Sequence, residues 1–201
     1  MPTSSISDFK TKLRKGGARP NLFEVDVTTP AGTNIWTNQT DQEDFHFLCK
    51  ATSMPTQTIG SVDVPFRGRI LKVAGDRTFE PWSVTVINDE DFNVRAAFEK
   101  WTELINNIES GQGEVTPEQY MSSGTIKQLG RSTVGSRSVG GSGPSDGSDV
   151  LYSYKVQDIW PSEIGSIDLS YESSDAIEEF TVTFQVQYMQ INPPAGQAAG
   201  S

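Results

Sequence analysis

Hydrophobic and polar residues alternate with a period of two in several short stretches of the chain. Within residues 22–27, Phe23, Val25 and Val27 fall on one side and polar residues on the other. Successive side chains of a strand point to opposite faces, so this alternation predicts half-buried strands. The pattern also predicts strands at 45–51, 62–66, 71–73, 82–87, 125–129, 150–156, 167–171 and 180–188. We therefore expect a mainly β fold, an antiparallel β-sandwich or barrel-like domain.

One stretch repeats its apolar residues at helical spacing instead and predicts a single packed α-helix at about residues 90–110. Asn88 or Asp89 is expected to cap its first amide groups, and Glu90 and Asp91 to complement the positive end of its dipole. The apolar stripe, which is expected to pack against the sheet, consists of Val94, Ala97, Phe98, Trp101, Leu104, Ile105 and Ile108.

Turn-forming residues separate the predicted strands. The segment Arg67–Arg69 predicts a basic turn, and the pair Gly75–Asp76 predicts a second, tight turn. Residues 28–44 are rich in turn-forming residues and predict a longer connection, which Trp36 is expected to pin in place.

The two ends and one internal tract differ in composition from the strand regions. Residues 1–18 are polar and predict an N-terminal arm with one helical turn around Ile6–Leu13. Residues 130–149 contain six glycines and six serines. Such a tract buries too little apolar surface to offset its ordering entropy, which predicts a flexible linker or hairpin tip. With a C-terminal tail at 191–201, the expected single domain spans 19–190.

The charge balance narrows the possible functions. The chain has 26 acidic and 16 basic residues and a formal net charge of −10. A protein of this charge repels phosphate backbones, which argues against one that grips DNA. The plain alternative is that the acidity serves solubility. No apolar run approaches the ~18 residues of a membrane span, and no signal-peptide stretch is evident, so we expect a soluble protein without direct membrane insertion.

Candidate catalytic chemistry is sparse. Cys49 is the only cysteine and His46 the only histidine, which excludes an internal disulfide and a metal site with several histidines. We expect Cys49 in the core and His46 on a strand surface. The acidic run Asp89–Asp91 could bind a hard cation, but helix capping is the better explanation. The glycine-rich tract lacks the Lys and Ser/Thr of a phosphate-binding loop, so no enzyme activity, cofactor or metal is expected.

The segment Val64–Trp101 reads VPFRGRILKVAGDRTFEPWSVTVINDEDFNVRAAFEKW. Its RGR, VAGDRTF, W-x-V-T-V and N-D-E/D motifs follow one another in an order that resembles tail tube proteins of contractile-tailed bacteriophages. The likeness continues in residues 19–23, 49–55, 159–161 and 165–188. The glycine-rich tract looks like an insertion into the family pattern.

This resemblance implies a structural virion protein whose copies form hexameric rings. The rings would stack into the inner tube of a contractile tail, with strands of neighbouring copies joined in an intersubunit β-barrel. Implied partners are the tail sheath protein, the tape measure protein, and the baseplate and tail terminator proteins. DNA would pass through without specific binding, and assembly would take place in the host cytoplasm.

Two groups of residues are candidate functional sites under this resemblance. The candidate subunit interface consists of Arg19, Arg67, Arg69, Asp76 and Arg77, because guanidinium groups pair well with carboxylates across an interface; a solvated turn is the alternative. The candidate tube lumen consists of Asp168, Ser170, Glu172, Thr181, Thr183, Gln185 and Gln187, the polar sides of predicted strands. Joining copies into a closed ring would also remove exposed sheet edges.

Two other interpretations remain open. The chain could form the inner tube of a contractile injection device or type VI secretion system, which shares the fold. It could instead be a monomeric carbohydrate-binding β-sandwich that uses Trp36, Trp82 or Trp160 as a stacking platform.

Overall fold

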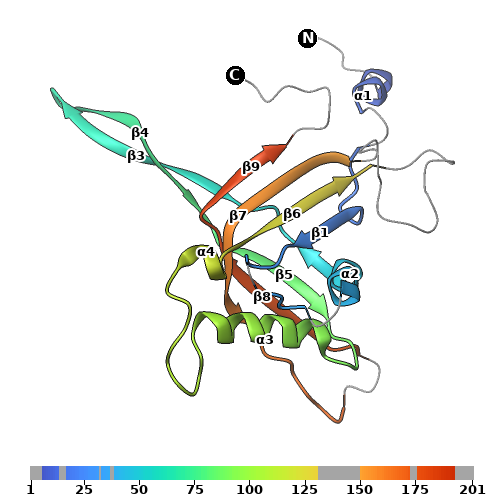
Figure 1. Ribbon diagram of the computed structural model, residues 1–201. Helices are drawn as coiled ribbons and strands as arrows, with labels where there is room; N and C mark the ends of the chain where they lie inside the picture. Colours follow the sequence, from blue (N-terminus) through green and yellow to red (C-terminus); the bar gives the residue numbers. More distant parts are fainter. Residues whose placement is uncertain are drawn as a thin grey trace. The chain divides into compact units, whose positions relative to one another are not determined.

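The computed structural model describes residues 6–13, 17–31, 33–36, 39–130, 150–172 and 176–192. The expected mainly β, antiparallel fold is confirmed (Figure 1). The helices are α1 (Ile6–Lys12), α2 (Gln39–Leu48), α3 (Asn93–Ile105) and α4 (Pro117–Tyr120). The strands are β1 (Phe23–Val27), β2 (Cys49–Thr52), β3 (Gln57–Phe66), β4 (Arg69–Phe79), β5 (Trp82–Ile87), β6 (Ser122–Leu129), β7 (Val150–Ile164), β8 (Glu179–Gln185) and β9 (Tyr188–Asn192). Most of the predicted insertion and C-terminal tail lies outside the described residues.

The strands form two sheets. The larger has the order β1-β6-β7-β8-β5-β2, with β9 paired to β7, and the smaller consists of β3 and β4. The chain divides into a larger unit of residues 25–126 and 154–191, and a smaller unit of residues 1–24, 127–153 and 192–201. Strands β1, β6, β7 and β9 contribute residues to both units.

The core of the larger unit lies between β5, β8 and α3. Alternate residues of β5 and β8 are fully buried on one face of the sheet, as the period-two pattern predicts. The helix covers this face with Val94, Ala97, Phe98 and Trp101, which confirms the first part of the predicted stripe. Ile108 lies beyond the end of α3 and is 87% exposed, so the stripe is shorter than predicted.

The start of α3 differs from the prediction. The helix begins at Asn93, after Phe92 in a left-handed conformation with φ 57°, and no side chain caps it. Asn88 is instead held at the end of β5, where its Nδ2 donates to Glu178 Oε2 at 3.0 Å. The predicted caps at Asn88 and Asp89 are therefore wrong, because the helix begins only at Asn93 and Asn88 binds Glu178, the residue before β8.

The predicted strand at 45–51 is mostly the helix α2, and only its last residues belong to β2. Phe45 and Cys49 are buried, whereas Phe47 between them is 80% exposed. Burial at a spacing of four residues fits a helix better than a strand. Trp36 packs on Phe45 with ring centroids 5.8 Å apart and so anchors the preceding connection, as expected.

Two further strand predictions fail in the last third of the chain. Residues 167–171 lie in a loop between β7 and β8 and pair with no strand. The predicted strand at 180–188 is divided, because β8 ends at Gln185 and β9 begins at Tyr188. Alternating hydrophobicity thus found β8 but did not fix where it ends.

Candidate assembly surfaces

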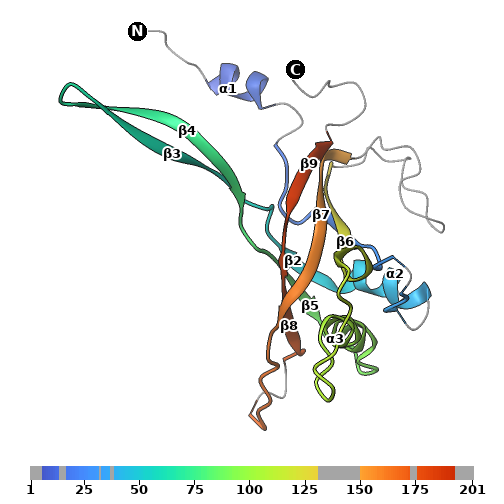
Figure 2. The same ribbon diagram turned by 60° about the vertical axis from the view of Figure 1, so that its left-hand side comes forward.

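The β3–β4 hairpin extends away from β2 and β5 within the larger unit (Figure 2). Every residue of β3 and most of β4 are exposed. Cross-strand pairing places Val62 with Val73 and Val64 with Leu71, while Asp63 with Lys72 falls on the opposite face. The first face, the apolar hairpin face, consists of Val62, Val64, Phe66, Leu71 and Val73.

A lone two-stranded hairpin is marginally stable in water, and a contiguous exposed apolar patch marks an interaction site. On the other face, Lys72 Nζ lies 2.9 Å from Asp63 Oδ1, an exposed pair that contributes little. The apolar hairpin face is therefore exposed in the single chain, and the opposite face carries this ion pair together with Ile70, which is 64% exposed. This arrangement suits a hairpin that packs on another chain.

The tip of the hairpin is a two-residue turn at Arg67–Gly68, which confirms the predicted basic turn. Both residues have positive φ, 46° and 80°, as a type I′ hairpin turn requires. The Arg67 guanidinium lies over the Phe66 ring at 5.3 Å from its centroid. A shallow hollow at the tip is lined by Phe66, Arg67, Arg69, Ile70 and Leu71.

The predicted tight turn at Gly75–Asp76 is wrong, because both residues lie inside β4. The register instead shifts between Ile59 and Ser61, so this part of the hairpin contains a β-bulge. A Cβ added at Gly75 would lie 3.2 Å from the Gly60 carbonyl oxygen, so the two backbones approach closely here. Gly75 therefore marks a β-bulge and not a reversal of the chain direction.

Four of the five candidate interface residues lie on this hairpin: Arg67, Arg69, Asp76 and Arg77. The fifth, Arg19, belongs to the smaller unit, where its carbonyl oxygen accepts a hydrogen bond from Gln128 Nε2 at 2.8 Å. Within the part of the chain that the structure describes, Arg67 and Arg69 form no ion pair. Their positions leave both guanidinium groups available to a partner.

The candidate lumen residues fall into two places. Thr181 and Thr183 lie on the polar face of β8, opposite the face that α3 covers, and their hydroxyls lie 3.3 and 3.4 Å from those of Thr85 and Ser83. Gln185 continues this face, which we call the polar ladder. Asp168, Ser170 and Glu172 lie in the exposed β7–β8 loop, and Gln187 lies between β8 and β9.

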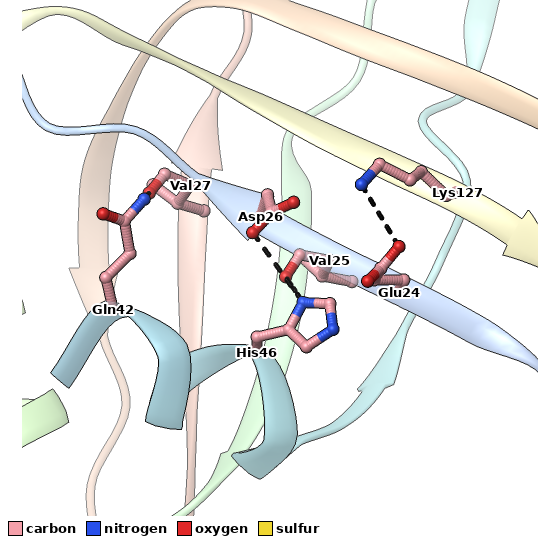
Figure 3. A network of polar contacts seen from close by, with 7 residues as sticks. All are labelled: Glu24, Val25, Asp26, Val27, Gln42, His46 and Lys127. Atoms are coloured by element: carbon pink, nitrogen blue, oxygen red, sulfur yellow. Dashed lines mark hydrogen bonds and ion pairs between the residues drawn. The ribbon is translucent and has the colours of Figure 1, made fainter. Parts of the chain in front are cut away.

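The outward edge of β1 carries a feature that the sequence did not predict. Leu22 O faces β6, because it accepts a hydrogen bond from Leu129 N within the smaller unit. Along the strand the carbonyl groups of Val25 and Val27 then point the other way. In the larger unit, His46 Nδ1 donates to Val25 O at 3.3 Å and Gln42 Nε2 to Val27 O at 3.4 Å (Figure 3).

These bonds occupy edge groups that could otherwise pair with another strand. Gln42 and His46 are four residues apart on α2, so one helix face reaches both carbonyls. His46 also lies 3.7 Å from Asp26 Oδ1. The expected strand-surface position of His46 is therefore wrong, and its role is to fasten α2 to the sheet edge. The sequence pattern, which predicts a strand at 45–51, gives no signal of this contact.

A second polar contact lies in the smaller unit. Lys127 Nζ is 3.1 Å from Glu24 Oε2, and the two side chains are 29% and 10% exposed (Figure 3). Breaking a partly buried ion pair on one side leaves the other charge poorly solvated. This pair joins β1 to β6 rather than forming a reactive site.

The described residues offer little for catalysis. Cys49 is buried, as expected, and burial raises the pKa of its thiol to about 12, so the nucleophilic thiolate is suppressed. The described residues contain no group of three or more His, Cys, Asp or Glu side chains able to hold a metal ion. No helix in those residues is long and apolar enough to cross a membrane. Trp36 and Trp82 are buried in the core and cannot form a sugar-stacking platform.

Comparisons with known proteins agree with one another. The family model described as "Phage tail tube protein" matches residues 18–192. The chain is 32% identical over 190 residues to tail tube protein gp19 of Enterobacteria phage T4, covering 92% of this chain and 99% of that one. It is 26% identical over 182 residues to the tail tube protein of Serratia phage KSP90, covering 89% and 92%.

Solved structures show the same fold at low sequence identity. A chain of the anti-feeding prophage baseplate matches with a TM-score of 0.59 and 12% identity, over 88% of this chain and 96% of that chain. A chain of an extracellular contractile injection system sheath-tube complex matches with a TM-score of 0.54 and 13% identity, over 95% and 99%. At such identities the likeness concerns architecture alone.

Proposed function

Because the chain belongs to the phage tail tube protein family, we propose that its copies form hexameric rings that stack into the inner tube of a contractile tail. The tube is the conduit through which DNA leaves the virion. The family match over residues 18–192 and the named phage relatives support this function. The protein is then a component of the virion tail, assembled in the host cytoplasm.

The observation that carries the proposal is the uncovered apolar hairpin face. A monomer that exposed Phe66 at 66%, Leu71 at 61% and Val62 at 53% on one side of a lone hairpin would be poorly soluble. Burial of this face against another copy removes that cost through the hydrophobic effect. The arginines at the hairpin tip supply the polar contacts at the rim of such an interface.

The lumen is proposed to be lined by the polar ladder. One face of β5 and β8 is covered by α3, so the face with Thr181, Thr183 and Gln185 is the wet one. When strands of neighbouring copies join into one barrel, this face would surround the channel. The assignment of Asp168, Ser170 and Glu172 to the channel wall depended on a strand at 167–171. These residues lie in a loop, so we do not include them in the proposed lumen.

Electrostatics favour passage over binding. Each copy brings a formal net charge of −10, and hydroxyl and amide groups of the polar ladder carry no positive charge to hold phosphates. DNA would therefore move through without specific contacts. The tape measure protein would occupy the channel before DNA does, the sheath protein would lie outside, and baseplate and terminator proteins would meet the tube ends. No catalytic activity is part of this function.

Negative-stain electron microscopy and sedimentation velocity test the proposal directly. Purified protein, studied over a range of concentrations and with added tail assembly initiator complexes, is expected to give rings and tubes of uniform diameter. Immunogold labelling of intact virions is expected to mark the tail. A sharp monomer under every condition, together with absence from virions, would show that the proposal is wrong.

A second candidate function is the inner tube of a contractile injection system, and the likeness in fold to the injection-system sheath-tube complex favours it. The higher sequence identity to phage tail tubes favours the phage tail. Isolated particles distinguish the two, because a phage tail is joined to a DNA-filled head and an injection device is not. The carbohydrate-binding alternative loses two of its three candidate tryptophans, because Trp36 and Trp82 are buried, whereas Trp160 is half-buried.

A further inference from the structure

The β5–β8 strand pair has different structures at its two ends. Trp82 pairs with Phe184 at one end and Ile87 with Glu179 at the other. The β3–β4 hairpin enters β5 at the Trp82 end, and the β7–β8 loop enters β8 at the Glu179 end (Figure 2). The five steps from Trp82 to Ile87, at about 3.3 Å each, separate these ends by roughly 17 Å within the larger unit.

The hairpin end is basic although the protein is acidic. Residues 57–79 contain four Lys or Arg and two Asp, a net charge of +2, whereas the whole chain has −10. Arg67 and Arg69 stand at the tip beside Phe66 and Leu71. The hairpin thus combines exposed apolar side chains with guanidinium groups that have no carboxylate partner in the described part of the chain.

The loop end has the complementary character. No Lys or Arg follows Lys155 in the sequence. The acidic loop, defined as Asp168, Leu169, Tyr171, Glu172 and Ile177, exposes two carboxylates together with three large apolar side chains. Leu169 is 81% exposed and Ile177 71%. Apolar side chains this exposed, beside acids that form no ion pair with any described residue, indicate a docking surface for a basic, apolar partner.

Hydrogen bonds hold both ends of the acidic loop in place. Gly165 N donates to Thr181 O at 2.7 Å, and Arg95 Nη1 donates to Gly165 O at 3.2 Å. A Cβ at Gly165 would lie 3.0 Å from Thr181 O, so glycine permits this close approach. At the other end, the main-chain N–H of Asn88 donates to the carbonyl oxygen of Glu178, and the Asn88 side chain donates to the Glu178 carboxylate. Because both ends of the loop are already held, binding would lose less conformational entropy.

We propose that the acidic loop of one copy receives the hairpin tip of a copy in the next ring. Arg67 and Arg69 would pair with Asp168 and Glu172, because planar guanidinium groups bind carboxylates well. Phe66 and Leu71 would pack against the apolar side chains of the acidic loop. Hairpin and loop leave opposite ends of one strand pair, so the contact is head to tail. Repeated from one ring to the next, such a contact generates a stack. The inference rests on the proposed function.

Charge reversal tests this contact. The variant Arg67→Glu with Arg69→Glu is expected to form rings that do not stack, and Asp168→Lys with Glu172→Lys the same. Like charges brought together across an interface repel, so the tube fraction should fall at least about tenfold. Combining all four substitutions restores opposite charges and is expected to restore tubes. Far-UV circular dichroism and thermal unfolding of each variant establish that the fold is intact.

The control is Glu109→Lys with Glu114→Lys, two exposed acids in the connection after α3, which changes net charge equally and is expected to leave tubes unaffected. Three outcomes would overturn the inference while leaving the proposed function intact. The tubes could survive both reversals, the combined variant could fail to stack, or the charge reversals could abolish the rings themselves. A wild-type chain that forms neither rings nor tubes would overturn both.

A cross-link gives an independent reading. The pair Arg69→Cys with Tyr171→Cys is expected to give a ladder of covalent multimers when assembled tubes are oxidised. Buried Cys49 should not interfere, since burial raises its thiol pKa to about 12. Arg69→Cys with Ile108→Cys is the control and is expected to give no ladder. Equal ladders from both pairs, or none from the first, would contradict the proposed contact.

Discussion

The indole of Trp82 on β5 stacks on the ring of Phe184 on β8, with centroids 5.2 Å apart and an interplanar angle of 28°. The two residues are register partners and both are fully buried. Phe184 also lies 5.8 Å from Phe98 and 6.0 Å from Trp101, both on α3. One side chain therefore joins the sheet to the helix that covers it.

Truncation of that side chain should be costly. Phe184→Ala removes a fully buried ring and leaves a cavity between β8 and α3, so the free energy of unfolding is expected to fall by about 3–5 kcal/mol. Phe47→Ala is the control, because Phe47 is 80% exposed and its loss should cost less than about 0.5 kcal/mol. Urea unfolding of a variant kept below its assembly concentration measures both. Similar losses would contradict the described core.

Gly124 on β6 lies against the same core. A Cβ there would be 2.9 Å from Trp82 Cζ3 and 3.1 Å from Val156 Cγ2. Gly124→Ala is therefore expected to destabilise the fold by about 1–3 kcal/mol through overpacking. At Gly60 an added Cβ would meet nothing closer than 3.5 Å, so Gly60→Ala should leave the urea midpoint almost unchanged. A neutral Gly124→Ala would show that β6 does not pack this closely on Trp82.

The sequence predicted those elements in which local pattern and burial agree. Alternation found β5 and β8 because each pairs with neighbours and has one buried face. It failed at 167–171, where Leu169 and Tyr171 alternate with polar residues but no strand pairs with them. Strand formation depends on partners that a single sequence does not reveal. It also failed at α2, where Phe47 completed a period-two pattern although it is exposed.

The candidate site shows the same division. The basic turn at Arg67 was predictable because Gly68 readily adopts the positive φ that the turn requires. Gly75 was misleading, because it lies at a β-bulge and not in a turn. The apolar hairpin face followed from sequence alternation, but its exposure did not, since nothing local says that β3 and β4 stand apart from the larger sheet. The edge contacts of His46 with β1 required the tertiary structure.

The single thiol should report on unfolding. Burial raises the pKa of Cys49 to about 12 from 9.0, so at pH 8 the folded chain is expected to react with a thiol reagent only when it opens. The linkage has a definite sign. Below pH 9 the thiol is protonated in both states, and between pH 9 and 12 the unfolded chain loses its proton first. Stability should therefore fall by up to about 1.4 kcal/mol per pH unit in that window.

Labelling kinetics with and without urea, and unfolding curves at pH 8 and pH 10, measure these effects. Cys49→Ala is the control for the pH dependence. Between pH 8 and pH 10 this variant should lose less stability than the wild type, because it has no thiol to ionise. Immediate labelling of the native protein at pH 8 would contradict the buried position.

The apolar hairpin face provides a last test that is separate from the tip charges. Val64 and Leu71 are cross-strand partners, 42% and 61% exposed in the single chain. Val64→Gln with Leu71→Gln should change the free energy of unfolding of the monomer little, because surface substitutions usually stay within about 0.5 kcal/mol. Assembly should be lost, since the variant no longer removes this apolar surface from water on association. The control Asp63→Asn with Lys72→Gln alters the neighbouring pair on the opposite face and is expected to assemble normally. Sedimentation velocity of the three proteins at equal concentration decides between them: if the glutamine variant assembles as well as the wild type, the hairpin face is not buried in the tube.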